Sequence, residues 1–487
     1  MTVVIDFRSV FFLTGILLSG LATAMFIPLF AELFIYQTSA WVGFLVSIFI
    51  CGFFGSALAL ANRPRDKIVL GMREAFLITA LSWVVLSLFA GLPFYNANLK
   101  FSFINAWFES VSSLTTTGAT IIKNLEDIPH GLLLWRALLQ WLGGTGIVVM
   151  AMTIFPTLRI GGMQLFRSEF SDRSEKILPR VSQIVTGILV IYIFFTLACG
   201  ILLYWAGMSA FDAICHAMST VSTGGLSTKN ASIGFYQNPL MEIIIMIFMI
   251  LGGSTLILYV RLWNGDLKAL RRDSQLKAYL GILLMASLIV TLCHWMGSRL
   301  DFMTSLRHGF FSTISVVTTT GFVTDDYGRW GSFYPMFFFI LGLIGGCTGS
   351  TTGGIKIFRF QVLFALTKSH LLQLRRPHGV YVPIYQDHKI SDSIAFSVFT
   401  FITLYSFCLV VLALTLSGLG LDFITSLSGA AACVSNVGLG LGNLIGPHTS
   451  FYKLGDGPKI VMMAGMILGR LELLTILVLF VPSFWRD

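Results

Sequence analysis

The sequence predicts an all-α polytopic membrane protein, in which two N-terminal helices precede four pseudo-symmetric units. Three observations predict it. First, 55% of the 487 residues are hydrophobic and 11% are charged, whereas soluble domains carry about 25% charged residues. Second, ten apolar segments are long enough to cross a bilayer as helices, which takes about 20 residues each. Third, four shorter segments between them share one pattern, a half-length apolar stretch followed by a cluster of Ser, Thr or Asn with Gly.

The ten spanning segments are expected at 9–35, 40–61, 72–92, 131–157, 181–206, 238–262, 276–296, 332–367, 393–417 and 458–482, the eighth being interrupted. The first segment also resembles a secretory signal peptide, because Arg8 precedes an apolar run that ends in a small-residue motif at 22–24. Apolar sequence continues past that motif, and Asp6 offsets the charge of Arg8. We therefore expect a retained spanning helix.

The basic residues predict the orientation in the membrane. Most of the 32 Lys and Arg fall in four alternate loops, within 63–73, 159–180, 261–277 and 359–389, which the positive-inside rule makes cytoplasmic. Both termini then lie inside the cell. The net charge of +9 thus needs no nucleic-acid partner, and the loops 158–180 and 261–277 are candidates for docking a protein partner.

The chain divides into a two-helix leader, 1–65, and four units, 66–160, 161–265, 266–375 and 376–487. Each unit contains one outer cluster: "NAWFESVSSLTTTGAT", "DAICHAMSTVSTGGLST", "GFFSTISVVTTTGFVTDD" or "GAAACVSNVGLGLG". The repeated "LDFMTSL" and "LDFITSL" before the last two clusters indicate duplication, and Asp212 is expected to cap the second short helix as the repeated Asp caps the others.

Helices of 10–14 residues are too short to span, so each cluster predicts a re-entrant loop. Non-helical backbone at membrane depth must be buried in protein or line a water-filled cavity. A pore is the prediction, although small-residue packing between helices is the alternative.

Backbone carbonyl groups from four such loops are suitable ligands for an alkali cation. The expected filter residues are Thr116, Thr117 and Gly118; Thr223, Gly224 and Gly225; Thr319, Thr320 and Gly321; and Asn436, Val437 and Gly438. From the residues alone, the filter glycine of the second cluster is Gly224 or Gly225, and that of the fourth is Gly438, Gly440 or Gly442. Asp325 and Asp326 either concentrate cations at the pore mouth or form a solvated turn.

The segment 345–354, "GGCTGSTTGG", should break the eighth helix, because each interior glycine costs about 1 kcal/mol relative to alanine. It contributes Gly345, Gly346, Gly349, Gly353 and Gly354 to a candidate gate loop. Arg470 is expected to bond this loop, or alternatively to pair with Glu472 or Glu109. Lys356 is either a second gate charge or a lysine that snorkels to the surface.

The remaining sequence motifs argue against metal, cofactor and catalytic sites. The seven cysteines form no CxxC pair, and the eight histidines form no HExxH motif. No phosphate-binding loop is present, so we expect no cofactor and no bound nucleotide in this chain. A polytopic membrane enzyme is a distant alternative, since its catalytic His, Asp or Glu residues are not gathered in the outer clusters.

The motifs "SLTTTGAT", "TTTGFVTD", "NVGLGLG", "QWLGGTGI", "IGGCTGSTTGGIKI" and "GRLE" resemble the Trk/Ktr/HKT superfamily of potassium uptake proteins, and within it the TrkH/TrkG branch. The resemblance implies a leader of two helices, filter glycines at Gly225 and Gly438, and preference for potassium because Gly118 stands where sodium-admitting plant relatives carry Ser. One departure is the pair Ser222 and Thr223, where close relatives often have more apolar residues.

The resemblance further implies a homodimer in the bacterial cell inner membrane, surrounded by lipid, with a cytoplasmic nucleotide-binding regulatory subunit of the TrkA type. The expected function is potassium uptake through a channel-like pore with K+ as the transported ion. Two alternatives stay open: the potassium-binding subunit of a P-type pump, and a potassium symporter coupled to H+ or Na+.

Overall fold

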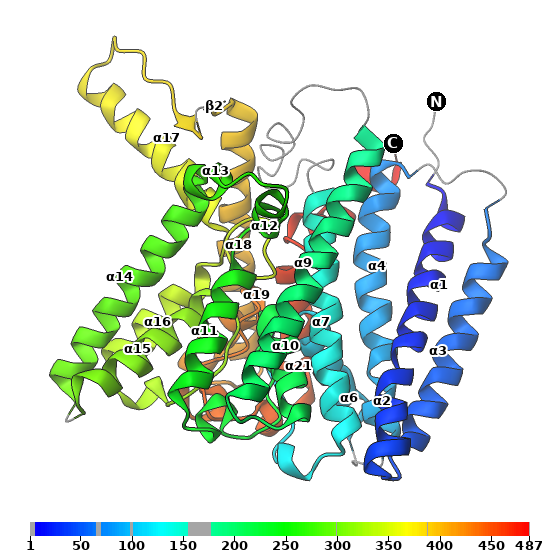
Figure 1. Ribbon diagram of the computed structural model, residues 1–487. Helices are drawn as coiled ribbons and strands as arrows, with labels where there is room; N and C mark the ends of the chain where they lie inside the picture. The colour runs from blue at the N-terminus through cyan, green and yellow to red at the C-terminus, as the bar shows by residue number, and fades with distance from the viewer. Residues whose placement is uncertain are drawn as a thin grey trace.

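The computed structural model describes residues 5–64, 70–97, 101–153, 177–298, 300–386 and 388–486. Most of the basic loop 158–180, one of the two candidate docking loops, lies outside these residues. The described chain is almost entirely helical, and its long helices run roughly parallel to one another (Figure 1).

The leader forms a layer at one side of the molecule (Figure 1). It contains α1 (Phe7–Ala24), α2 (Phe26–Phe30), the π-helix η1 (Ala31–Tyr36) and α3 (Trp41–Ala61). Two glycines let α1 and α3 approach closely, because a methyl group on Gly15 or Gly55 would meet the backbone of the opposite helix within 3.1 Å. Glu32, in η1 between the two long helices of the leader, is fully buried and accepts hydrogen bonds from Gly131 N and Thr38 Oγ1. The leader is thereby attached to the first unit.

The four units follow in order along the chain. The first contains α4 (Met72–Ala90), α5 (Leu92–Asn96), α6 (Phe103–Leu114), η2 (Leu125–Asp127) and α7 (His130–Thr153). The second contains α9 (Ile177–Trp205), α10 (Ala210–Val221), η4 (Ser232–Phe235), α11 (Pro239–Gly253) and α12 (Leu256–Trp263), and α13 (Lys268–Arg272) begins the third.

The third unit contains α14 (Ser274–Gly297), α15 (Phe302–Val317), η5 (Tyr327–Arg329), α16 (Phe333–Leu343) and α17 (Ile357–Arg375). A short antiparallel hairpin of β1 (Ile384–Tyr385) and β2 (His388–Lys389) opens the fourth. Then come α18 (Asp392–Gly418), α19 (Phe423–Val434), α20 (Gly442–Ile445), η6 (Phe451–Lys453), α21 (Asp456–Arg470), α22 (Leu474–Leu477), η7 (Val478–Phe480) and α23 (Ser483–Arg486).

The predicted half-length helices are α6, α10, α15 and α19, with 12, 12, 16 and 12 residues. A side chain caps the first turn of each one, as the orphan amides of a helix start require. The caps are Ser102, Ser209, Asp301 and Asp422. The expectation that Asp212 caps the second helix is wrong, because Ser209 Oγ accepts from the amide of Asp212.

Seven described helices are long and apolar enough to cross a membrane, and nine segments qualify if each bent helix pair counts as one span. The predicted eighth span is interrupted as expected, between α16 and α17. The predicted sixth and tenth spans are not continuous helices: α11 and α12 meet at 92°, and α21 and the helical segment 474–480 meet at 105°. Hydropathy does not reveal these bends. The first follows the weak helix formers Gly252 and Gly253, and the second contains Glu472 and Leu473 with φ of 59° and 46°.

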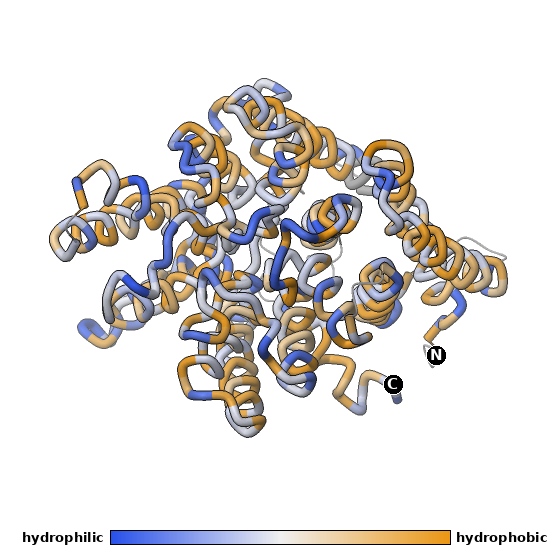
Figure 2. The backbone as a smooth tube through the Cα atoms, turned by 90° about the horizontal axis from the view of Figure 1, so that it is seen from below, coloured by the Kyte–Doolittle hydropathy of each residue, from blue (hydrophilic) through white to orange (hydrophobic). Residues whose placement is uncertain are grey.

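The start of α1, the end of α23 and the loops around α13 and α17 lie at the same end of the molecule (Figure 1). Viewed along the long helices, hydrophobic segments form most of the periphery, while hydrophilic segments occur near the middle and in surface loops (Figure 2). Large apolar side chains on the outer helices are exposed, among them Phe49 at 73% and Phe407 at 63%. Such a surface suits a hydrocarbon environment.

Candidate functional site

Four glycine-containing segments follow the short helices α6, α10, α15 and α19, and they share one backbone geometry. The ring glycines, as we name them, are Gly118, Gly225, Gly321 and Gly438, with φ between 76° and 86°. Two residues before each of them, Thr116, Thr223, Thr319 and Asn436 have φ between 50° and 54°. Because left-handed conformations are costly for residues other than glycine, their recurrence at four matching positions indicates a constrained structure.

A matching hydrogen bond sets the register of each segment. The amide of the residue before the ring glycine donates to the carbonyl oxygen five residues earlier, at 2.8–2.9 Å in all four segments. In the fourth segment this donor is Val437, so the ring glycine is Gly438. Gly442, one of the three glycines that the sequence left open, is instead the first residue of α20.

The four segments close a ring. A methyl group built on Gly118 would overlap the carbonyl oxygen of Gly224, which precedes the ring glycine of the second segment. In the same way, a methyl group on Gly225 or Gly321 would overlap a carbonyl oxygen of the following segment. A methyl group on Gly438, in the fourth segment, would overlap the carbonyl oxygen of Thr117 in the first. The contacted carbonyl groups are those of Thr117, Gly224, Thr320 and Val437. No side chain fits at these glycines, because its Cβ atom would overlap a backbone carbonyl oxygen of the next segment.

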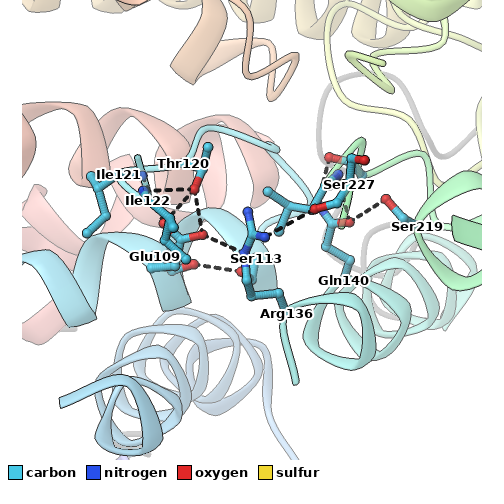
Figure 3. Close-up of polar contacts among 11 residues, drawn as sticks. Glu109, Ser113, Thr120, Ile121, Ile122, Arg136, Gln140, Ser219 and Ser227 are labelled. Atoms are coloured by element: carbon cyan, nitrogen blue, oxygen red, sulfur yellow. Dashed lines mark hydrogen bonds and ion pairs between the residues drawn. The ribbon is translucent and has the colours of Figure 1, made fainter. Parts of the chain in front are cut away.

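A buried polar network holds the first two segments (Figure 3). Glu109, on α6, accepts hydrogen bonds from Thr120 Oγ1 at 3.0 Å, Ile121 N at 2.9 Å and Arg136 Nε at 2.7 Å. Arg136, on α7, also donates to the carbonyl oxygen of Ser227 at 3.2 Å. Glu109 and Arg136 are at most 1% exposed. One ion pair thus joins the backbones that follow the first and second ring glycines.

Gln140, one turn after Arg136 on α7, fixes the second segment directly. Its Nε2 donates to the carbonyl oxygen of Gly224 at 2.6 Å, and its Oε1 accepts from Ser219 Oγ at 2.7 Å and Leu226 N at 3.2 Å. The sequence analysis missed Arg136 and Gln140, although polar residues in the spanning segment "LLLWRALLQWLGG" are a signal, since they are costly in lipid and face the protein interior.

A cavity of about 370 Å³ is lined by all four ring glycines and by residues that follow them in the chain. Its charged lining residues are basic: Lys123, Arg136, Lys229 and Lys453. Asp325 and Asp326 are not among the residues that line it. Asp325 instead accepts from Trp330 Nε1 at 2.7 Å, and Asp326 accepts from Gly328 N at 3.0 Å. The turn interpretation of this aspartate pair is the one that the contacts favour.

The loop between α16 and α17 contacts residues that precede the ring glycines. Its ends are joined by a bridge between Ile344 and Ile355. Between them, Cys347 N donates to the carbonyl oxygen of Gly253 at 2.9 Å, and Gly353 N donates to Thr319 Oγ1 at 2.8 Å. The loop therefore contacts both the bend after α11 and the third glycine segment. All five of its candidate gate glycines, Gly345, Gly346, Gly349, Gly353 and Gly354, fall in this stretch.

Arg470, the last residue of α21, bonds this loop. Its Nη1 donates to the carbonyl oxygen of Thr351 at 2.9 Å, and its Nη2 donates to that of Gly143 at 3.3 Å. Pairing with Glu472 or Glu109 is excluded by geometry, because Glu472 pairs with Arg359 at 2.5 Å and Glu109 with Arg136. Arg470 is 2% exposed, so its charge lies within the protein.

Lys356 is also buried, at 6% exposed, and its ammonium group donates to the carbonyl and hydroxyl oxygens of Thr352. It does not snorkel to the surface, so that alternative is wrong. Lys356, Arg470, Glu472 and loop residues enclose a space of only about 20 Å³, which is room for about one water molecule.

The expected position of Arg359 is wrong. As the first residue of the range 359–389 it was expected in a cytoplasmic loop, but its side chain is fully buried. Its guanidinium pairs with Glu472 and lies 3.6 Å from the ring centroid of Phe401. The guanidinium group is therefore part of the protein interior near the gate loop. The expected cytoplasmic loop 359–389 thus has one basic residue fewer than the sequence suggested.

Known proteins match this chain over most or nearly all of its length. The family model TrkH, described as a cation transport protein, matches residues 43–486. The chain is 46% identical over 421 residues to the Trk system potassium uptake protein TrkI of Halomonas elongata, covering 85% of this chain and 84% of that protein. It is 37% identical to the Trk system potassium uptake protein TrkH of Salmonella typhimurium, over 99% of this chain and all of the other.

A solved structure also matches. The crystal structure of the potassium transporter TrkH from Vibrio parahaemolyticus superposes with a TM-score of 0.91 at 33% identity, covering 99% of this chain and 100% of that one. The family consists of membrane transport proteins rather than enzymes, which removes the enzyme alternative. With a helical membrane fold, four glycine segments in a ring and these matches, the chain belongs to the TrkH family of cation transport proteins.

Proposed function

We propose that this chain takes up potassium across the bacterial inner membrane as the pore-forming subunit of a Trk system. The observation that carries the proposal is the ring in which four glycines lie beside four backbone carbonyl groups. Carbonyl oxygens replace the hydration shell of an alkali cation without a fixed charge that would trap it. The curated relatives, which are named potassium uptake proteins, support potassium as the ion. Family membership favours this function over the potassium-binding subunit of a P-type pump.

The selectivity filter in this proposal comprises the three residues up to and including each ring glycine. The carbonyl groups of the two residues before each glycine are the ligands. One residue separates the end of each short helix, α6, α10, α15 and α19, from the first of these residues. Because the C-terminal end of a helix carries partial negative charge, the four helix ends favour a cation at the ring.

The gate in this proposal is the loop 345–354, with Lys356 and Arg470. In this proposal the loop lies in the ion path under the ring, and Arg470 bonds it while adding positive charge below the filter. For ions to pass, the loop must leave this position. We further propose a homodimer with cytoplasmic termini, regulated by a nucleotide-binding cytoplasmic subunit of the TrkA type; names of the curated relatives as Trk system proteins support such a partner.

Uptake of Rb+ into vesicles that contain the purified protein tests this function. Unlabelled K+ should compete with Rb+ at much lower concentration than Na+ or Li+ does, and empty vesicles should show no uptake. Equal competition by K+ and Na+ would contradict potassium selectivity. Absence of uptake both from the protein alone and after addition of a TrkA-type partner would contradict the transport function.

A further inference from the structure

Thr351 is the point at which the gate loop is attached to the second filter segment. Its hydroxyl oxygen lies 3.0 Å from Thr223 Oγ1 and 3.1 Å from the carbonyl oxygens of Val221 and Gly252. Its amide donates to the carbonyl oxygen of Gly252 at 3.2 Å, and its carbonyl oxygen accepts from Arg470. One loop residue therefore joins the filter, the bend after α11 and the buried arginine.

The third filter segment contacts the loop in a similar way. Gly353 N donates to Thr319 Oγ1 at 2.8 Å. Thr319 and Thr223 stand at matching positions, two residues before their ring glycines, with φ of 53° and 52°. In the first segment, the hydroxyl of the matching residue Thr116 has no hydrogen-bond partner in the described protein. In the fourth, Asn436 donates to Met466 O and Thr117 Oγ1 rather than to the loop.

We propose that Thr223 and Thr351 form a latch that holds the gate loop closed against the filter, with Thr319 as its second point. Thr223, Thr319 and Thr351 are at most 1% exposed, so water does not replace their bonds while the loop is in place. A loop that moves out of the ion path has to break these bonds and the bond to Arg470. The proposal rests on the proposed function, because it requires that the loop is the gate.

The latch also couples the gate to the filter. Thr223 and Thr319 supply hydroxyl groups to the loop, while their own backbones belong to the segments that form the ring. Their strained left-handed conformation is held by surrounding contacts, and the loop supplies part of these contacts. Release of the loop therefore loosens the second and third segments, whereas the first and fourth, which lack these side-chain bonds, stay as they are.

Valine substitutions test the latch, because valine has the shape of threonine without its hydroxyl. Thr351→Val and Thr223→Val should raise Rb+ uptake by vesicles without a partner subunit roughly two- to tenfold, which is the effect of losing one buried hydrogen bond from the closed state. The double variant should rise no further than the larger single effect, since both changes remove one shared bond. Thr351→Ser, which keeps the hydroxyl, should restore the wild-type rate.

Thr220→Val is the matched control. Thr220 precedes Thr223 by three residues, but its hydroxyl donates to the carbonyl oxygen of His216 in its own helix. Its uptake rate should equal that of the wild type. All variants are compared at equal yield of monodisperse protein on size-exclusion chromatography, and the ratio of Rb+ to Na+ uptake is recorded for each.

Three results would overturn the latch. They are wild-type uptake rates in both single valine variants, additive effects in the double variant, and failure of Thr351→Ser to restore the rate. A failure of the proposed function looks different: the wild type itself would then not transport Rb+, with or without a partner. An unchanged ratio of Rb+ to Na+ uptake in a faster Thr351→Val would support the latch, since Thr351 is not a filter residue.

Discussion

The buried ion pair between Glu109 and Arg136 offers the most demanding test of how the filter is supported. Glu109 accepts three kinds of donor, from Thr120, Ile121 and Arg136, and both members of the pair are almost completely buried. Arg136→Met leaves the carboxylate without its cation, and Glu109→Gln leaves the guanidinium without its anion. Removing one partner of a buried pair costs about 3–5 kcal/mol, because an uncompensated charge stays in the interior.

The expected result is that each single variant lowers the free energy of unfolding by about 3–5 kcal/mol, whereas the double variant loses less than the sum. Unfolding of the purified protein by a denaturing detergent, followed by tryptophan fluorescence, measures the three differences. Rb+ uptake should fall in parallel, since the pair joins the backbones that follow Gly118 and Gly225. Lys123→Met, which removes an exposed positive charge from the cavity that the ring glycines line, is the control and should leave stability unchanged. Additive losses in the double variant, or single variants as stable as the wild type, would refute the reasoning.

Three further predictions concern the ring, the gate and a helix cap. Gly225→Ala should abolish selective Rb+ uptake, because the added methyl overlaps a carbonyl group of the next segment, whereas Gly418→Ala, which meets open space, should have no effect. Arg470→Gln should raise Rb+ uptake in the absence of a partner, since it removes a positive charge and weakens a loop contact. For Asp422, a hydrogen bond from Thr425 lowers the pKa of the carboxyl group. Its cap is present above the unfolded pKa of about 3.9 and is lost as the pH falls through the lowered folded value, so the Tm difference caused by Asp422→Ala should be constant from about pH 5 to pH 8 and shrink only below about pH 4.

Each of these three has a contradicting outcome. Full selectivity in Gly225→Ala would mean that the segment does not form a tight ring. A lower partner-free uptake in Arg470→Gln, at normal yield, would mean that the arginine opens the path rather than closing it. A Tm difference for Asp422→Ala that changes between pH 5 and pH 8 would show that the carboxylate titrates well above its expected range.

Much of the fold could be predicted because the membrane imposes a strong length rule on apolar helices. The spans and the four half-length helices follow from that rule, and the positions of the four glycine segments follow from the need to place irregular backbone inside protein. The register of the fourth segment did not follow from residue counting. It depends on the hydrogen bond from Val437, which sequence does not show, and only the family resemblance pointed to Gly438.

The buried charges were the hardest part to predict. Arg470 was recognisable because it stands in the middle of an apolar segment, and its contact with the gate loop is present in the structure. Arg359 lies in the first turn of α17, which is polar and partly exposed further on, so its sequence context matches that of a cytoplasmic residue. Its partners Glu472 and Phe401 are far away in sequence: Phe401 lies on α18, and Glu472 lies in the bend after α21. Such partners become visible only when the helices are packed.

The central claim is that four backbone segments around the ring glycines select potassium. Its most direct test compares Rb+ and Na+ uptake by vesicles that contain the wild type, Gly321→Ser or the control Gly418→Ser. The account predicts preference for Rb+ in the wild type and the control, and loss of this preference in Gly321→Ser, because a side chain there overlaps the carbonyl group of Val437. Unchanged preference and rate in Gly321→Ser would contradict the account, and the ring would then be packing between helices.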